Sequence, residues 1–376
     1  MKIGILTHCL GYNYGGLLQN YALQQVLIKL GHEPITLNHQ PKSLSYKRKF
    51  LSLCKRALGK IKGSDLPLFG YPTKVQLDYI NKNLDEFKNR CIFKTEQFSL
   101  KEMREKINVF PFHAIIVGSD QVWRYKMMKN EILEMFLSSF QNKNIKKISY
   151  AASFGTDFWE MPQDVTDVAK CLVRKFDKIS VREQSAIRLC KEQLGVDACV
   201  VLDPTLLLSS DEYIQVVKSG PFNIEDRPNS LLTYILDQDI YKKELIDSII
   251  SQTGLIKNEI YPRSKFAKVG RKKIEDCVYP SVEEWLKGFL DAEMVITDSF
   301  HGTVFSIIFN KPFWVIGNEV RGMARFQSLL SMFDLNNRLI ENYPTDIREP
   351  IDWYEVNDKL ENMKKKSINF LKDNLL

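Results

Sequence analysis

VITDSFHGTVFSII, residues 295–308, contains the clearest fold signal in the sequence. It predicts a buried strand, a short polar turn, and a helix whose apolar residues recur at helical spacing. His301 lies at the expected start of that helix, where free backbone N–H groups and the helix dipole favour a bound anion. Ser299 or Thr303 alone would explain the polar turn as a helix cap, so both interpretations stay open.

The same alternation of strand, turn and helix recurs along the chain. Strands are predicted at Lys2–Thr7, Pro34–Asn38, Ala114–Val117, Ile148–Ala152, Ile179–Val181, Val200–Leu202, Leu231–Leu236 and Lys311–Ile316. Helices are predicted at Leu17–Leu30, Lys74–Arg90, Leu100–Ile107, Gln184–Leu194, Lys242–Gln252 and from a capping box at Ser281 through Leu290. Most of the strands in the first half are followed by small or polar residues. In a parallel sheet such strand ends line one crevice.

At 376 residues the chain exceeds a typical single core, which predicts two domains. We expect two doubly wound, Rossmann-type α/β domains that face a central cleft, with residues 1–208 in the first and 209–350 in the second. Ser209, Gly220 and Pro228 mark the expected linker region between them. Residues 351–376 are expected to contain a helix, about Val356–Leu371, that packs back on the first domain.

Composition indicates a reduced, cytoplasmic setting. The seven cysteines are odd in number and include no C-x-x-C pair, so neither a disulfide framework nor a zinc site is predicted. No apolar run is long enough to span a bilayer, and the first strand is too short for a signal peptide.

The net charge of +7 is unevenly distributed. Residues 42–62 contain eight lysines and arginines and no acidic residue, interleaved with leucines and a phenylalanine. Such a basic amphipathic segment suits peripheral contact with the inner face of an anionic membrane or steering of an acidic substrate, and a solvated helix and loop is the alternative. No nucleic-acid-binding motif accompanies the charge, so nucleic acid is not an expected partner.

Several motifs together resemble those of the polysaccharide pyruvyl transferase family. They are, in chain order, Asn13-Tyr14-Gly15-Gly16 with the helix after it, Val117-Gly118-Ser119-Asp120-Gln121-Val122-Trp123, Tyr150-Ala151-Ala152-Ser153-Phe154-Gly155, Val181-Arg182-Glu183, Leu202-Asp203-Pro204-Thr205 and Thr297-Asp298-Ser299-Phe300-His301-Gly302-Thr303. The resemblance implies a GT-B-like architecture. It also implies transfer of pyruvate from phosphoenolpyruvate onto a sugar hydroxyl pair, as a ketal, in surface polysaccharide (capsule) biosynthesis.

The resemblance also implies roles for residues at the matching positions. His301 is the expected general acid, and Asp120 the expected base or hydrogen-bond acceptor. Relatives often have arginine and leucine before the motif histidine, where this chain has Ser299 and Phe300. Donor binding is therefore expected from Arg182, Ser299, Phe300, Arg321 and Arg325, with Arg321 or Arg325 replacing the missing arginine. Acceptor binding is expected from His8, Asn13, Gly15, Gly16, Gln121 and Ser153.

The expected co-substrate is phosphoenolpyruvate, the expected acceptor is a lipid-linked or nucleotide-linked sugar, and no other cofactor is expected. Asp237-Gln238-Asp239 resembles a metal-binding D-x-D motif, but the order of elements differs from that of GT-A enzymes, so no metal is predicted. Two alternatives remain open. One is a GT-B glycosyltransferase that uses a nucleotide sugar, and the other is a non-catalytic carbohydrate-binding or scaffold protein.

Overall fold

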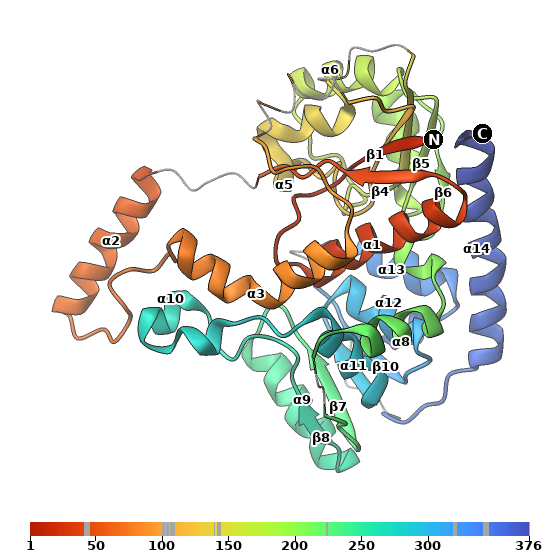
Figure 1. Cartoon of the computed structure of the whole chain (residues 1–376). Helices are drawn as coiled ribbons and strands as arrows, with labels where there is room; N and C mark the ends of the chain where they lie inside the picture. The colour runs from red at the N-terminus through yellow and green to blue at the C-terminus, as the bar shows by residue number, and fades with distance from the viewer. Residues whose placement is uncertain are drawn as a thin grey trace.

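The computed structural model of the chain describes residues 1–40, 46–99, 102, 105, 110–138, 140, 144–222, 225–318, 322–340 and 346–375. Two parallel β-sheets, one from each half of the chain, lie one above the other in Figure 1 with helices packed around them. The α/β class predicted from the sequence is therefore confirmed. Among the described residues, no helix combines the length and the apolar character needed to cross a bilayer.

Six of the described strands form the first sheet, in the order β2-β1-β3-β4-β5-β6, and every neighbouring pair is parallel. These strands are β1 (Lys2–Leu6), β2 (Glu33–Thr36), β3 (Ala114–Val117), β4 (Lys146–Ala152), β5 (Lys178–Val181) and β6 (Cys199–Val200). The helices of this half are α1 (Tyr14–Lys29), α2 (Tyr46–Ile61), α3 (Lys74–Cys91), α5 (Tyr125–Met128), α6 (Gln163–Val173) and α7 (Ser185–Leu189). A π-helical turn at Cys190–Leu194 extends α7, and 3-10 helices lie at Lys129–Phe136 and Pro204–Leu207.

The second sheet has the order β11-β10-β9-β7-β8 among the described strands and is also parallel. Its strands are β7 (Ser230–Tyr234), β8 (Ile256–Asn258), β9 (Ala292–Thr297), β10 (Phe313–Ile316) and β11 (Leu339–Ile340). Its helices are α8 (Ser210–Ser219), α9 (Ile240–Thr253), α10 (Phe266–Val269), α11 (Val282–Asp291), α12 (Phe300–Ile308) and α13 (Ala324–Met332), with 3-10 helices at Gly270–Cys277 and Asn336–Arg338.

In each sheet the chain reverses the direction in which it adds strands after the first two strands. In the first sheet the chain goes from β1 to its neighbour β2 on one side and then to β3 on the other. In the second sheet, β7 lies between β8 and β9 in the same way. Ligands of open parallel sheets bind outside the carboxyl ends of the strands at such a switch point. The fold thus brings together the loops after β1, β3, β7 and β9.

The C-terminal helix α14 (Trp353–Leu375) runs beside both halves and ends next to the first sheet (Figure 1). Its Ser367 hydroxyl accepts a hydrogen bond from Leu202 N at 3.0 Å, and Phe370 packs near Tyr150 with ring centroids 6.2 Å apart. Other contacts join the halves. The Tyr14 hydroxyl donates to Pro280 O at 2.8 Å, and Gln184 N donates to Ser328 Oγ at 3.0 Å.

Two local expectations differ from the structure, and a third falls largely outside the described residues. Helix α1 begins at Tyr14, three residues before the predicted start, so the Gly15-Gly16 pair belongs to its first turn. The expected linker from Ser209 to Pro228 is wrong in part, because α8 starts there with a capping box between Ser209 and Glu212. The helix predicted at Leu100–Ile107 lies outside the described residues except for positions 102 and 105.

Candidate active site

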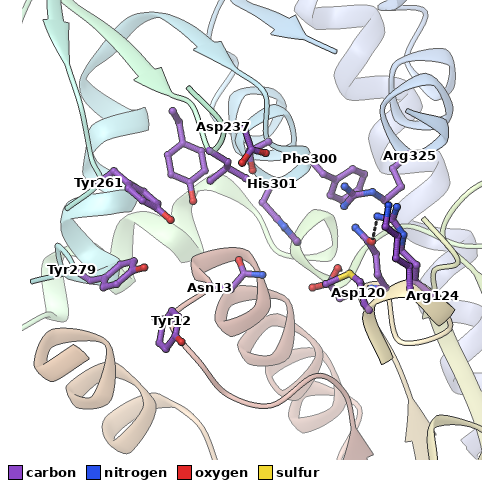
Figure 2. A pocket seen from close by; sticks show the side chains of 16 residues that line it. Tyr12, Asn13, Asp120, Arg124, Asp237, Tyr261, Tyr279, Phe300, His301 and Arg325 are labelled. Atoms are coloured by element: carbon purple, nitrogen blue, oxygen red, sulfur yellow. Dashed lines mark hydrogen bonds between the residues drawn. The ribbon is translucent and has the colours of Figure 1, made fainter. Parts of the chain in front are cut away.

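A cavity of about 480 Å³ opens between the two switch points. It is lined by Tyr12, Asn13, Asp120, Gln121, Arg124, Lys126, Met127, Tyr234, Leu236, Asp237, Tyr261, Tyr279, Ser299, Phe300, His301 and Arg325. Figure 2 shows cationic side chains gathered at one end, tyrosines at the other, and His301 between them. Both halves of the chain therefore contribute to a single site.

His301 is fixed by the start of α12 and by the start of α1. Ser299 is the N-cap of α12, where its hydroxyl accepts from Gly302 N at 3.3 Å, so the capping interpretation of this turn is correct for Ser299. The imidazole packs against Gly15 in the first turn of α1. A Cβ added at Gly15 would lie 2.0 Å from His301 Nδ1, so any larger residue there would displace the imidazole. Two helix N-termini thus converge at this imidazole, and neither has an acidic residue in its first turn.

The environment of His301 favours the neutral imidazole. Burial lowers its pKa below the usual value. The carboxylates of Asp203 and Asp120 oppose this shift, and the positive charges of Arg182 and Arg325 add to it. Its Nε2 lies 3.8 Å from Asp203 Oδ2, beyond hydrogen-bond distance. A neutral imidazole whose pKa responds to nearby charge can gain a proton when an anion binds beside it.

Arg182 holds together two carboxylates from the first half. Its Nη1 donates to Asp203 Oδ2 at 2.8 Å, and its Nη2 lies 3.4 Å from Asp120 Oδ1. Ser119 Oγ also donates to Asp203 Oδ2 at 3.1 Å, and Thr205 donates to the other oxygen. Arg182 does not line the cavity, because Phe300 covers its guanidinium with 4.3 Å between Cζ and the ring centroid. Its geometry fits a positioning residue rather than a direct donor ligand.

Asp120 faces the cavity with its charge retained. Burial alone would raise the pKa of this carboxyl, but the positive charge of Arg182, with His8, His301 and Arg325, holds it well below its usual range. The backbone at Asp120 has φ of 73°, and its Oδ1 accepts from Gln121 N at 2.9 Å. A carboxylate with a lowered pKa is a weak base and a good hydrogen-bond acceptor, so the geometry favours the second of the two expected roles.

The cationic end of the cavity contains Arg124 and Arg325, and Lys126 also lines the cavity. Arg124 Nη1 donates to Gln121 Oε1 at 2.9 Å, and its Nε lies 3.7 Å from Glu160. The Arg325 guanidinium lies over the Phe300 ring, 5.5 Å from the centroid. Burial, and then the charge of Arg182, lower the pKa of Arg325 to about 9. The positive charges here therefore repel one another, and an anion placed among them would relieve that repulsion.

The opposite wall is aromatic. Tyr12 and Tyr279 have ring centroids 5.7 Å apart, and Tyr261 lies 5.7 Å from Tyr279 at nearly a right angle. Tyr234 follows at 6.1 Å from Tyr261. These rings come from three different loops and a strand end, and Figure 2 shows the Tyr12, Tyr261 and Tyr279 side chains at the end opposite the arginines. Rings with hydroxyl groups present both a flat apolar face and a polar edge, as sugar rings require.

The remaining predicted residues divide into two groups. Asn13, Gln121, Ser299, Phe300 and Arg325 line the cavity with His301 and Asp120. Asn13 is the N-cap of α1, but its side chain makes no capping bond and is directed at the cavity (Figure 2). His8, Gly15, Gly16 and Ser153 do not line it. Ser153 is buried and donates to Glu183 Oε1 at 2.9 Å, which is a structural contact. Arg321 lies outside the described residues.

Sequence reasoning missed Arg124, Lys126 and the tyrosine wall. Arg124 directly follows the quoted motif that ends at Trp123, so extending the polar turn by one residue would have found it.

The D-x-D resemblance has a structural explanation. Asp239 caps α9, and Asp237 accepts a hydrogen bond from Asn318 at 2.9 Å. Among the residues that the structure describes, no group of three or more His, Cys, Asp or Glu side chains could hold a metal ion.

Comparison with known proteins identifies the family. The polysaccharide pyruvyl transferase family matches residues 13–320, a span that includes every motif quoted above. The chain belongs to the polysaccharide pyruvyl transferase family. No curated protein sequence matches it significantly.

Solved structures establish the GT-B fold expected for this pyruvyl transferase family member. The UDP-GlcNAc 2-epimerase from Neisseria meningitidis, bound to UDP-GlcNAc, superposes with a TM-score of 0.52 at 11% identity, covering 100% of this chain and 99% of that chain. The UDP-GlcNAc 2-epimerase from Methanocaldococcus jannaschii, in complex with UDP-GlcNAc and UDP, also gives a TM-score of 0.52 at 13% identity, covering 98% and 94%. At this level of identity the similarity extends to the fold alone.

Proposed function

We propose that the protein transfers pyruvate from phosphoenolpyruvate onto two hydroxyl groups of a sugar, forming a cyclic ketal and releasing phosphate. The observation that supports this most is the layout of the cavity, with His301 between a cationic end and a tyrosine wall (Figure 2). Phosphoenolpyruvate combines a carboxylate and a phosphate with an enol carbon that must be protonated. The cationic end suits the first two groups, and His301 suits the third.

In this proposal the donor binds with its anionic groups toward Arg124, Arg325 and the N-termini of α1 and α12. Bound negative charge raises the pKa of His301, which is lowered in the free protein. The imidazolium then gives its proton to the methylene carbon of the donor, and positive charge develops at the adjacent carbon.

The sugar would stack on Tyr12, Tyr261 and Tyr279, with its hydroxyls directed toward His301 and Asp120. The first hydroxyl oxygen bonds to the activated carbon and loses its proton. The carbon–oxygen bond to phosphate breaks, and the second hydroxyl closes the ketal. One hydroxyl proton replaces the proton given up by His301, and the other leaves with phosphate, so no further cofactor is needed. Asp120 accepts a hydrogen bond from the attacking hydroxyl and orients it.

We place this reaction in surface polysaccharide assembly in the cytoplasm, where phosphoenolpyruvate is made, with either a lipid-linked or a nucleotide-linked sugar as acceptor. The test is incubation with phosphoenolpyruvate and a panel of galactosides. Phosphate release and the new ketal methyl signal in the NMR spectrum are measured together, and His301→Gln serves as the inactive control. Matching amounts of phosphate and ketal support the proposal. Sugar transfer from a UDP-sugar without phosphate release would overturn it in favour of a glycosyltransferase, and carbohydrate binding without any turnover would favour a scaffold.

A further inference from the structure

Residues 46–71, which we call the basic arm, extend away from both sheets. The arm consists of α2 (Tyr46–Ile61) and the segment that returns toward α3 (Figure 1). In the sequence, residues 46–64 contain seven basic residues and no acidic one, and the first acidic residue after them is Asp65. The proposed reaction gives these basic residues no role, because none of them lines the catalytic cavity.

One face of α2 is anchored to the rest of the molecule. Arg56 Nη1 donates to Pro67 O at 2.8 Å and to Ala267 O at 2.9 Å, which ties the helix to its own return segment and to α10. Pro67 in turn packs against Gly270, where an added Cβ would lie 2.7 Å from Pro67 Cβ. These contacts fix which face of the helix is directed outward.

The outward face of α2 is mainly apolar. Phe50 is 64% exposed, Leu58 61% and Ile61 84%, and with the exposed thiol of Cys54 they form one stripe at helical spacing. The return segment adds exposed Leu68 and Phe69, and an apolar groove of about 390 Å³ lies between it and α2. A helix that served only as a solvated surface would expose its polar face instead.

Exposed lysines flank this stripe on both sides. At 100° per residue, Lys47 lies at the N-terminal end of the stripe itself and Lys55 beside one edge. Lys49 and Lys60 lie beyond the other edge. An apolar stripe bordered by cations is the arrangement of helices that lie in the interface of an anionic bilayer. A second copy of the arm would bring like charges together, which disfavours self-association through this face.

We propose that the basic arm docks the protein on an anionic lipid bilayer, with Phe50, Leu58 and Ile61 inserted at the interface. The base of the arm lies close to the catalytic cavity. A second pocket, of about 190 Å³, is lined by Pro72 and Phe266 and shares Tyr12, Tyr261 and Tyr279 with that cavity. Docking through the arm would therefore hold the tyrosine wall near the membrane surface.

The test is co-sedimentation of the full-length protein with vesicles of phosphatidylcholine alone or mixed with phosphatidylglycerol, at low and at high salt. We expect binding only to the anionic vesicles, weakened by salt. Phe50→Ser/Ile61→Ser and Lys55→Gln/Lys60→Gln should each reduce the partition coefficient by about tenfold or more. Matched controls are Ile240→Ser, an equally exposed apolar residue on α9, and Lys365→Gln/Lys366→Gln on α14; neither should change binding.

Several results would overturn the proposal. These are equal binding to neutral and anionic vesicles, absence of binding, wild-type binding by both arm variants, or a dimer that Phe50→Ser/Ile61→Ser converts to a monomer. The vesicles contain no substrate, so this test is independent of the proposed reaction. Turnover of a water-soluble acceptor should be unchanged in the arm variants, which distinguishes failure of the arm from failure of the active site.

Discussion

The turns after β3 and β9 face each other across the cavity and use their polar residues differently. After β3, Asp120, Gln121 and Arg124 all line the cavity. After β9, Asp298 is fully buried and accepts from Leu236 N at 2.6 Å and from Lys242 Nζ at 2.8 Å. The aspartate of the first turn therefore faces the cavity, whereas the aspartate of the second turn joins the ends of two strands.

This difference shows that an aspartate directly after a strand can have either a structural or a ligand-binding role. Asp298 is a structural link because backbone N–H groups at the end of β7 and a lysine of α9 reach it. Asp120 remains at the cavity because its charge is balanced from behind by Arg182. The partner that approaches each carboxylate, which the local sequence does not specify, decides its role.

The largest expected effect tests the structural turn. Asp298→Ala should lower the free energy of unfolding by about 3–5 kcal/mol, because it removes the buried carboxylate that lies 2.8 Å from the Lys242 ammonium and accepts from Leu236 N. Asp239→Ala, in the loop after β7, removes an N-cap and an exposed carboxylate 3.8 Å from the same ammonium, and should cost only about 1 kcal/mol. Urea unfolding measures both. Equal losses in the two variants would mean that Asp298 is not the link described above.

The next prediction tests His301, the residue of the β9 turn to which we assign a catalytic role. His301→Ala should reduce kcat by about a hundredfold or more, measured by phosphate release, because the donor then lacks its proton source. Stability should change far less than in Asp298→Ala, since His301 Nε2 has no hydrogen-bond partner among the described residues and lies 3.8 Å from Asp203 Oδ2. The control is His113→Gln, an exposed histidine far from the cavity. Unchanged turnover in His301→Ala would remove the catalytic role.

The fold followed from the sequence because its signals are local. The strand Ala114–Val117 has the predicted bounds, and the capping box at Ser281 opens α11 as expected. Helix α8 was missed because serine, glycine and proline suggested a linker. The capping box between Ser209 and Glu212 was the available signal for it.

The site was only partly predictable, because its residues meet through long-range packing. The strand-end motifs contained His301 and Asp120, both of which line the cavity. No local pattern joins Tyr12 to Tyr261 and Tyr279, which lie about 250 positions further along the chain. Nor does the sequence show that Phe300 separates Arg182 from the cavity while leaving Arg325 at its edge.

A third prediction tests donor binding at the cationic end of the cavity, to which both halves of the chain contribute. Arg325→Ala should weaken phosphoenolpyruvate binding by about tenfold or more in calorimetric titration, because a buried guanidinium at the cavity edge is lost. Arg124→Ala, on the β3 turn, should act in the same direction. Arg174→Ala removes an exposed charge elsewhere and is the matched control. If donor affinity is unaltered in both cavity variants, phosphoenolpyruvate does not bind at this end of the cavity.

The smallest expected effect is a pH dependence of donor binding that originates at His301. In the free protein its pKa is lowered, mainly by burial, so the imidazole is neutral near pH 7. A bound anion raises that pKa, so between the free and bound pKa values each donor that binds takes up a proton. Affinity should therefore increase as the pH falls through this window, by less than about tenfold.

Calorimetry in buffers of different ionisation enthalpy measures the proton uptake directly. His301→Gln should abolish the uptake while keeping most of the affinity, because Arg124 and Arg325 remain. Uptake that persists in this variant would assign the proton to another group and leave His301 without its proposed role as proton donor.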